Sequence, residues 1–592
     1  MEKRRCLLLL LVPLVYAAVL SFSFSGEWFP ADDRQELVFV RGLSSTGALF
    51  GADVFGLFRP VKNLLFRLFV AMSPLGVDAC RLVGIAIGIA SFFPVLALCR
   101  RILGNEWKAI LAASVWLLSP TLVSSAAWLS CVNIQLMTAF AALSMVGHDS
   151  AWNGDYFRPR RVVSAGLFLF LALLSYESAI ALVPLFFAFD FYLKPSRIRH
   201  RSAWSAYGTY AVVAMVYLLL RHAFRAATVM ENLSFANTAR WQLVVSSPYF
   251  TGQHFASWFW PFGRFAVFAD YRWGQVPLFA LFLCAALFIG ILFFALAARK
   301  RFPALGFSIL FSLVAFSPVS NCLGLKNGPY GDYYLTLASV GLAMASVEAA
   351  SFLFYVKGRL RTVAFAIATA FIGIRLLAIP EAAKWAQFWG DGNLALSESI
   401  KNFPDSFSNK VQRSMMLCDA GRYEEALEIG RQVEEAVGTD SPLMGNIHLV
   451  RAIYALQVEK NAGTAFAEIE KSAYKDGPGG VQKNRHYYRG CVFEDLVGDE
   501  AAAEAEYETA LQGKWNVDLV PCADRLARLK AIRGERDEAI ELWEKAAKLD
   551  PSNAAILWNL SIAYREAGKN ARAAELRARA EMLVREKATR RE

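Results

Sequence analysis

Two neighbouring carboxyl groups follow the first long apolar run of the chain. Asp32 and Asp33 lie in Phe29-Pro30-Ala31-Asp32-Asp33-Arg34, a short distance beyond the apolar residues 6–25. Carboxylates at the mouth of an apolar helix bundle could take a proton from an acceptor hydroxyl, or orient a cation beside a phosphate. Taken alone, the acidic pair is also compatible with an ordinary polar loop.

Two cationic side chains come later in the same segment. Arg59 and Lys62 belong to Arg59-Pro60-Val61-Lys62-Asn63, which opens an amphipathic stretch that continues to about residue 75. Arginine can bind phosphate oxygens through two parallel hydrogen bonds and lysine binds them as a point charge, so both suit the phosphate group of a lipid. The alternative is that these long side chains only extend to lipid headgroups.

Three further ionisable residues stand close to apolar runs. Glu177 lies between two such runs with almost no loop, where a charged group is costly and indicates function. Lys326 and Asp332 flank a turn rich in glycine and proline, so Lys326 could face an anionic donor and Asp332 could support the same site. His222 and His254 are single histidines, and we predict structural roles for them.

The elements that must position these residues are apolar helices. The chain has 592 residues, 56% of them hydrophobic, and its mean hydropathy is +0.35. A membrane span needs about 20 mostly apolar residues. The pattern predicts about eleven spans, at residues 6–25, 80–99, 108–127, 130–147, 162–176, 177–193, 204–222, 277–297, 303–320, 335–356 and 362–380.

The basic residues between these runs predict the orientation of the chain. With eleven spans, the Lys and Arg clusters at 3–5, 100–101, 158–161, 194–201, 299–301 and 357–361 all fall on the side of the N-terminus. Positive residues collect on the cytoplasmic side, so we expect a cytoplasmic N-terminus and an extracytoplasmic C-terminal half. No small-residue cleavage pattern follows the first run, so we expect it to remain as a span rather than leave as a signal peptide.

The C-terminal part has a different pattern, with helix pairs and a repeat of 34 residues. The repeat places glycine at a turn and small residues where two helices touch, as in tetratricopeptide repeats. Looser copies run around Gly421 and Gly498, and a degenerate copy covers about 446–475. Four to five units would stack as a short solenoid, presenting a groove for a peptide or acting as a plain spacer. The residues in step are Leu526 with Leu560, Gly534 with Gly568, Ala539 with Ala573 and Ala546 with Ala580.

Composition and sequence pattern argue against several other functions. The net charge of +11 lies largely in loops that flank membrane spans, so it does not indicate a nucleic-acid partner. The nine cysteines are scattered without the spacing of a zinc site. The apolar half shows no paired broken-helix halves of the kind found in transporters.

In combination, these features resemble the transmembrane and tetratricopeptide-repeat-containing O-mannosyltransferases, which belong to the type C glycosyltransferase superfamily. Four positions depart from the family pattern: Ser119 replaces histidine, Ser124 an acid, Tyr176 lysine and Tyr333 arginine. The stretches similar to the family are, in chain order, Phe58-Arg59-Pro60-Val61-Lys62-Asn63-Leu64, Ser119-Pro120 with Ala127-Trp128-Leu129-Ser130, Leu173-Leu174-Ser175-Tyr176-Glu177, and Asp332-Tyr333-Tyr334-Leu335 with Ser339-Val340-Gly341.

The resemblance implies an all-α protein, with a polytopic membrane bundle at 1–385 and an extracytoplasmic tetratricopeptide-repeat solenoid at 386–592. It implies transfer of a sugar from a polyprenyl-phosphate lipid to an extracytoplasmic acceptor such as a protein hydroxyl. The basic inner loops favour a bacterial inner membrane as the location. No cofactor or metal ligand is assigned, and a need for a divalent metal stays open. The implied roles are Asp33 or Asp32 as the catalytic acid, Arg59, Lys62 and Lys326 for the donor phosphate, and Glu177 and Asp332 as supporting residues.

Two other classes of protein stay open. One is an O-antigen ligase or polymerase-like transferase, which relies on Arg and His in a large outer loop, here residues 223–276 with Arg225, Arg240, His254, Arg264 and Arg272. The other is a non-enzymatic membrane-anchored scaffold whose repeats recruit proteins. A scaffold would tolerate replacement of Asp32 and Asp33.

Overall fold

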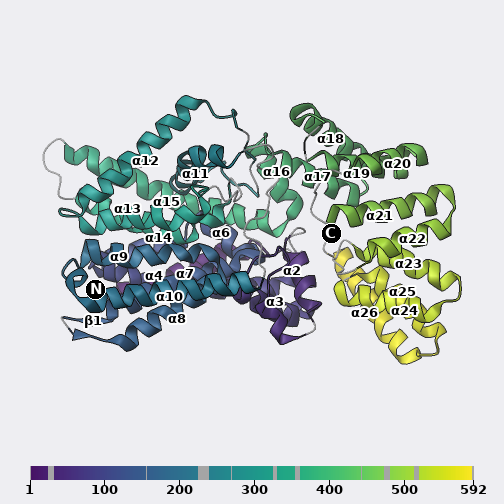
Figure 1. Ribbon diagram of the computed structural model, residues 1–592, viewed down its shortest axis with the longest axis horizontal. Helices are drawn as coiled ribbons and strands as arrows, with labels where there is room; N and C mark the ends of the chain where they lie inside the picture. The colour runs from purple at the N-terminus through teal and green to yellow at the C-terminus, as the bar shows by residue number, and fades with distance from the viewer. Residues whose placement is uncertain are drawn as a thin grey trace. The chain divides into compact units, whose positions relative to one another are not determined.

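The computed structural model of the chain is built almost entirely of helices, as predicted (Figure 1). It describes residues 2–24, 32–43, 45–154, 156–224, 239–267, 270–271, 273–323, 330–353, 360–439, 441, 443–472, 480–512, 519–551 and 553–589. The chain forms two compact units, one of Met1–Glu36 with Ser45–Asn409 and one of Leu37–Ser44 with Lys410–Glu592. The division near Asn409 lies beyond the predicted boundary at 385, which falls inside helix α15 (Leu360–Gly390).

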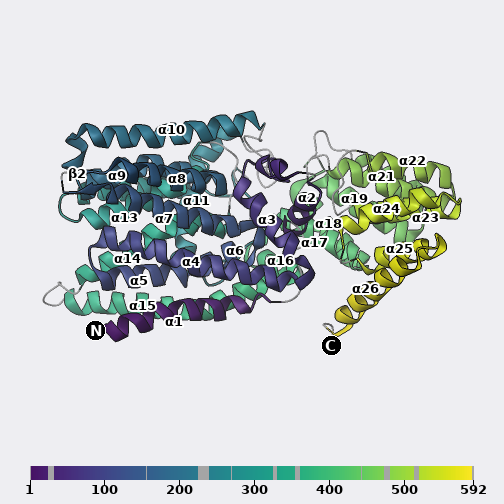
Figure 2. The same ribbon diagram turned by 90° about the horizontal axis from the view of Figure 1, so that it is seen from below.

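The first unit is a bundle of apolar helices that run alongside one another, with α1 beside α15 (Figure 2). Its elements up to the short antiparallel hairpin β1–β2 are α1 (Glu2–Ser21), α2 (Asp32–Arg41, whose end belongs to the second unit), η1 (Thr46–Phe50), α3 (Pro60–Met72), η2 (Ser73–Leu75), α4 (Val77–Leu103), α5 (Glu106–Leu117), α6 (Pro120–Ala127), η3 (Leu129–Cys131), α7 (Val132–Ser150), β1 (Trp152–Asn153) and β2 (Tyr156–Phe157).

The remaining elements of this unit continue the bundle. Gly341, within a stretch that resembles the transferase family, allows α14 to approach α13 closely, because a side chain there would collide with Ser308 and Ser312. The elements are α8 (Pro159–Ser175), η4 (Glu177–Ala181), α9 (Leu182–Leu193), η5 (Arg197–Arg199), α10 (Arg201–Ala223), α11 (Arg240–Phe259), α12 (Leu278–Ala298), α13 (Pro303–Phe316), η7 (Ser317–Val319), η8 (Asp332–Tyr334), α14 (Leu335–Leu353), α15 and α16 (Gly392–Asn402).

Several of these helices are suited to cross a membrane, although fewer than predicted meet the requirement in full. Each predicted apolar run overlaps a helix. Among the described residues, six helices are long and apolar enough to span, or seven if α5 and α6, bent by 60° at Leu118–Ser119, count as one. Helices α8 and α9, with 17 and 12 residues, are shorter than a full span. The first unit is therefore polytopic in character, and the count of eleven stays a prediction.

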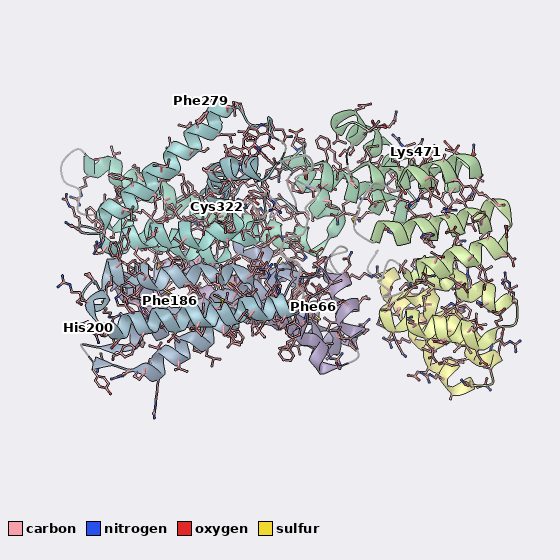
Figure 3. The ribbon with its side chains drawn as sticks, in the orientation of Figure 1. Phe66, Phe186, His200, Phe279, Cys322 and Lys471 are labelled. Carbon is pink, nitrogen blue, oxygen red and sulfur yellow. The ribbon has the colours of Figure 1, made fainter. Side chains whose placement is uncertain are left out.

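The exposed apolar surface of helix α12 indicates that the first unit is surrounded by lipid. It is apolar all round, and only 11% of its most apolar window is buried in the protein. Phe279, 76% exposed, projects from its beginning (Figure 3). A helix with large apolar side chains on every side and few protein neighbours requires an apolar solvent around it.

A buried polar network ties together helices α7, α9 and α10 at the end of the bundle where α7 finishes. The His148 ring lies 3.0 Å from an Asp190 oxygen through Nε2 and 3.1 Å from the Tyr210 hydroxyl through Nδ1. Arg197 reaches Asp190 at 3.3 Å and Asp149 at 3.0 Å. Charges excluded from water are tolerated when each has such a partner.

In the second unit, the described residues form five consecutive helix pairs. Small residues at equivalent positions of the second helix in each pair are buried, and they let the two helices pack closely: Ala426, Ala465, Ala503, Ala539 and Ala573. The helices are α17 (Phe407–Asp419), α18 (Tyr423–Val437), α19 (Met444–Tyr454, continued by the π-helical turn η9, Ala455–Glu459), α20 (Ala462–Lys471), α21 (Gly480–Val492, continued by the π-helical turn η10, Phe493–Val497), α22 (Glu500–Ala510), α23 (Val520–Ile532), α24 (Arg536–Leu549), α25 (Ala554–Glu566) and α26 (Asn570–Thr589).

The turn within each pair needs one residue in the left-handed backbone region. Gly421, Gly498, Gly534 and Gly568 occupy this position with φ between 74° and 86°. In the pair α19/α20, Lys460 takes the position with φ 51°. This is why the second copy reads as degenerate in sequence: it keeps the turn but lacks the glycine that marks it.

Exchanging the residue type at two of these turns should have opposite effects. Gly534→Ala should lower the free energy of unfolding by about 1 kcal/mol, because no neighbour contacts the added methyl and only the backbone strain counts. Lys460→Gly should raise it by up to about 1 kcal/mol by removing the same strain. Thermal unfolding of the full chain in detergent measures both, and shifts of equal sign would contradict the assignment of this turn.

Candidate active site

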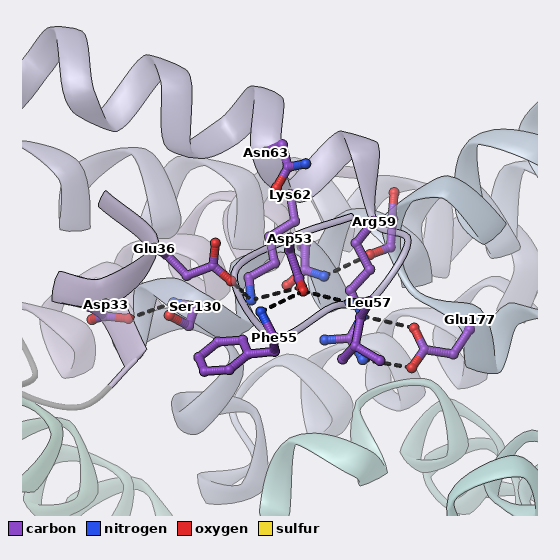
Figure 4. A network of polar contacts seen from close by, with 12 residues as sticks. Asp33, Glu36, Asp53, Phe55, Leu57, Arg59, Lys62, Asn63, Ser130 and Glu177 are labelled. Atoms are coloured by element: carbon purple, nitrogen blue, oxygen red, sulfur yellow. Dashed lines mark hydrogen bonds and ion pairs between the residues drawn. The ribbon is translucent and has the colours of Figure 1, made fainter. Parts of the chain in front are cut away.

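The Asp33 carboxylate is held by a turn far away in sequence. Asp33 stands in the first turn of α2 and is 1% exposed. Its Oδ1 accepts a hydrogen bond from the Ser130 backbone N–H at 2.7 Å, and its Oδ2 accepts one from the Leu129 N–H at 3.3 Å. Both donors belong to η3, whose first N–H groups have no partner within the helix. Figure 4 shows this contact at one side of a polar cluster.

Both acids of the pair are shifted towards neutral pKa values. Burial raises the pKa of Asp33 to about 6, against the opposing effect of its hydrogen bonds to Ser130. Burial also raises the pKa of Asp32 to about 6, although the positive charge of Lys62 opposes the shift. Asp32 keeps more exposure than Asp33. The pair thus combines a fixed, buried carboxyl with a partly accessible one, and both can take up a proton near neutral pH.

Lys62 lies in the centre of the cluster and is enclosed by acids. It pairs with Glu36, and its Nζ lies 3.6 Å from Asp53 Oδ2. The other Asp53 oxygen accepts the N–H groups of Phe55 and Leu57 at 3.0 and 2.8 Å, which fixes this carboxylate in its loop. Burial alone would lower the pKa of Lys62, but its two acidic neighbours raise it above its ordinary value. Lys62 therefore stays charged, and its charge is compensated.

Arg59 forms the second ion pair of the site. The proline at position 60 starts α3 and leaves Arg59 just before the helix. Its Nε and Nη2 donate to the two Glu177 oxygens at 2.8 and 2.6 Å, and its guanidinium carbon lies 4.2 Å from the centre of the Tyr176 ring. Such a bidentate pair fixes the plane of the guanidinium. Within the described part of the chain, Arg59 Nη1 makes no hydrogen bond, so one edge stays available.

Aromatic rings pack next to these ion pairs. The Trp128 indole stacks on Trp389 with centroids 4.7 Å apart and meets Tyr333 edge-on at 5.6 Å. The Trp389 Nε1 donates to the Ser124 hydroxyl at 3.0 Å. One region thus contains three positions at which the sequence departs from the pattern it resembles: Ser124, Tyr176 and Tyr333. Two aromatic rings and a hydroxyl lie there, where that pattern has two cations and an acid.

The structure brings together most of the residues selected from sequence. Asp32, Asp33, Arg59, Lys62 and Glu177 all belong to the cluster of Figure 4 or border on it. The Ala127–Ser130 stretch anchors Asp33, and the Ser175–Glu177 stretch supplies the partner of Arg59, so motifs spread along the chain meet at one place.

One predicted residue, Asp332, is not part of this cluster. Asp332 is buried at the start of η8, and neither of its carboxylate oxygens makes a hydrogen bond within the described structure. Lys326 lies outside the described residues. His254 is buried, with Nδ1 2.8 Å from the Phe250 carbonyl and Nε2 accepting the Gly331 N–H at 3.2 Å.

Three site residues were missed by the sequence reasoning: Glu36, Asp53 and Cys131. Glu36 lies one helical turn after Asp32 and Asp33, so its spacing could have indicated the shared face. Asp53 carries no sequence signal beyond its position before a turn. The Cys131 thiol lies among Lys62, Arg59 and the two aspartates. Within the described ranges, no group of three or more His, Cys, Asp or Glu side chains is arranged to hold a metal ion.

Comparison with known families identifies the repeats. Residues 528–568 match the model of the TPR repeat, the tetratricopeptide repeat. This confirms the predicted repeat type in the segment where the 34-residue period is clearest. No curated protein sequence matches the chain.

Solved structures show distant similarity to parts of the chain. ArnT from Cupriavidus metallidurans bound to undecaprenyl phosphate is 14% identical, with 69% of this chain and 80% of that chain covered and a TM-score of 0.34. MamA is 17% identical over 30% of this chain and 96% of its own, with a TM-score of 0.22. YrrB, a TPR protein with an unusual peptide-binding site, is 16% identical over 32% and 92%, with a TM-score of 0.21. These TM-scores are too low to support an argument about function.

Removing one partner of the Arg59 pair should destabilise the protein. Glu177→Gln leaves a buried guanidinium uncompensated, and we expect a loss of about 3 kcal/mol, the lower end of the range for buried pairs because Glu177 keeps partial exposure. Thermal unfolding of the purified protein measures this loss. The matched control is Glu398→Gln, which breaks an exposed pair with Lys401 and should change nothing measurable. Equal melting temperatures for the two variants would contradict a structural role for the Arg59–Glu177 pair.

Proposed function

We propose that the protein is a membrane glycosyltransferase that moves a sugar from a polyprenyl-phosphate lipid to a hydroxyl group of an extracytoplasmic acceptor. The observation that carries the proposal is the Asp33 carboxylate, buried and oriented by two backbone N–H groups beside two compensated cations. A loop or scaffold has no need for such a costly arrangement of charges. The sequence resemblance to O-mannosyltransferases supports the same class of enzyme.

The proposed reaction is a single displacement at the anomeric carbon. Asp33 takes the proton of the acceptor hydroxyl as the hydroxyl oxygen forms its bond to the anomeric carbon. The bond between that carbon and the phosphate oxygen breaks, and the lipid phosphate leaves with the electron pair. Attack from the opposite side would invert the anomeric centre. Asp32, which is more accessible, is the alternative base.

Arg59 is the better of the two described candidates for the leaving phosphate. Its Nη1 edge makes no hydrogen bond to the described residues, whereas Lys62 is enclosed by Glu36 and Asp53. A cation beside the departing phosphate stabilises the charge that develops there. Lys62 is then a positioning residue that favours the ionised form of Asp32. Lys326 and Asp332 keep their proposed roles in donor binding and support of the site.

The proposed setting is a bacterial inner membrane, with eleven spans, a cytoplasmic N-terminus and the repeats in the periplasm. The tetratricopeptide match supports a protein acceptor or partner, since such repeats present extended surfaces to peptides. No cofactor beyond the donor lipid is proposed, and the need for a divalent metal is open.

The ligase-like alternative draws little support from its outer-loop residues. His254 is buried with both ring nitrogens engaged, and Arg264 donates to Gln253. Arg225 and Arg272 lie outside the described residues.

Replacing Asp33 by the isosteric Asn should abolish transfer in cells. In a deletion strain complemented at matched expression, intact-protein mass spectrometry of envelope proteins should show a hexose-sized mass that returns with wild type. We expect it to fall about 100-fold or more with Asp33→Asn, the usual contribution of a general base. The exposed Asp405→Asn is the control and should restore the mass fully. If Asp33→Asn restores it, Asp33 is not the base; if the double Asp32→Asn/Asp33→Asn variant also does, the scaffold or the ligase-like transferase replaces the proposed enzyme.

The rate of transfer should depend on pH through these acids. The base must be ionised, and burial raises the pKa of Asp33 and of Asp32 to about 6. The rate in isolated membranes should therefore be constant above about pH 7 and fall as the pH drops through 6, by up to tenfold per unit. Radiolabelled sugar transfer at a series of pH values measures the profile. A midpoint near pH 4, the ordinary value for aspartate, would contradict the buried-base assignment.

A further inference from the structure

An arginine stands inside the last apolar helix of the bundle. Arg375 lies in α15, within the apolar run 362–380, and its side chain is 9% exposed. At about 1.5 Å per residue it lies roughly 8 Å from the end of that run, on the side that leads to Trp385 and Trp389. An ionisable residue in such a segment is rare and indicates a functional site with a specific partner.

Within the described structure, the hydrogen bond and the ring contact of Arg375 both come from Trp258. Its Nη1 donates to the Trp258 carbonyl at 2.6 Å, and its guanidinium carbon lies 4.6 Å from the centre of the Trp258 indole ring. Trp258, near the end of α11, is 0% exposed. The Nη2 of Arg375 and the Nε1 of Trp258 are both buried without a hydrogen-bond partner in the described structure.

Arg375 differs in this respect from the cations of the candidate active site. Arg59 faces Glu177, and Lys62 faces Glu36 and Asp53. Within the described ranges, no carboxylate pairs with Arg375. A buried charge without a counter-charge is strongly unfavourable, and each unused buried donor adds a further cost. An anion bound at this place would remove both costs.

We infer that Arg375 and Trp258 form a binding site for the phosphate group of a membrane lipid. A guanidinium matches phosphate oxygens and is the cation most easily removed from water, and an indole N–H can donate to the same group. The position near the end of an apolar run fits the headgroup layer, where tryptophan is also enriched. Trp260 follows Trp258 by two residues in the sequence, and Trp385 and Trp389 follow Arg375 further along α15.

The phosphate has two possible sources with one chemistry: a bulk anionic phospholipid, or the polyprenyl phosphate of the proposed donor. The residues of this site are not those of the Asp33 cluster, and the inference rests only on the membrane character of the first unit. Failure of the transferase proposal would leave it standing, because its test measures lipid binding and not transfer.

The test uses the purified full-length protein in mild detergent. Native mass spectrometry would count bound lipid after addition of phosphatidylglycerol, undecaprenyl phosphate, uncharged diacylglycerol or sodium phosphate, and melting temperatures would be recorded in parallel. Wild type should retain one of the two phosphate lipids with at least about tenfold higher affinity than Arg375→Gln, a difference of about 1.4 kcal/mol. The lipid that is retained identifies the source.

Control variants keep the result interpretable. Lys384→Gln, which removes an exposed charge on the same helix, should bind lipid like wild type. If Arg375→Gln does not fold, Trp258→Phe removes only the indole donor and should still weaken lipid retention measurably. Equal retention by wild type and the folded variant, or equal protection by diacylglycerol or sodium phosphate, would overturn the proposal.

Discussion

A charge can be buried in an apolar bundle only if the chain supplies its partner, and the candidate active site depends on this constraint. Asp33 is compensated by backbone N–H groups, Lys62 by two acids and Arg59 by Glu177. The partners come from α2, the loop before α3, η3 and η4, which are far apart in sequence. The contacts that neutralise the charges therefore also hold these segments next to one another. The interactions that prepare the site for chemistry are therefore the same ones that hold its segments together.

The sequence allowed the residues of the site to be chosen, but not their pairing. The order of the motifs was sufficient to select Asp33, Arg59 and Glu177, because each stands in a stretch of recognisable pattern. That Arg59 meets Glu177, 118 positions away, depends on the packing of α3 against the end of α8, which no local pattern encodes. Glu36 and Asp53 were missed for the same reason. Their role arises from burial next to Lys62, and a solvated acid in a loop has the same sequence signal.

The apolar runs in the sequence predicted the positions of helices well, but they predicted the number of membrane spans less well. Hydropathy predicts where a helix forms in lipid, and every predicted run overlaps one. Whether a run crosses as a single straight helix depends on breaks such as the 60° bend between α5 and α6, before Pro120. That bend has a use here, because it leaves the N–H groups of the following turn η3 near Asp33.

The repeats of the second unit vary in length, and the π-helical turns η9 and η10 contribute to this variation. From Ala426 to Ala573 the interval between equivalent buried alanines shortens from 39 to 34 residues. Each π turn accommodates one of the additional residues at the end of its helix, just before the left-handed turn residue. Length can thus drift between repeats while the helix contacts are kept. A sequence comparison that assumes a constant repeat length does not detect such copies, although their helices pack in the same way.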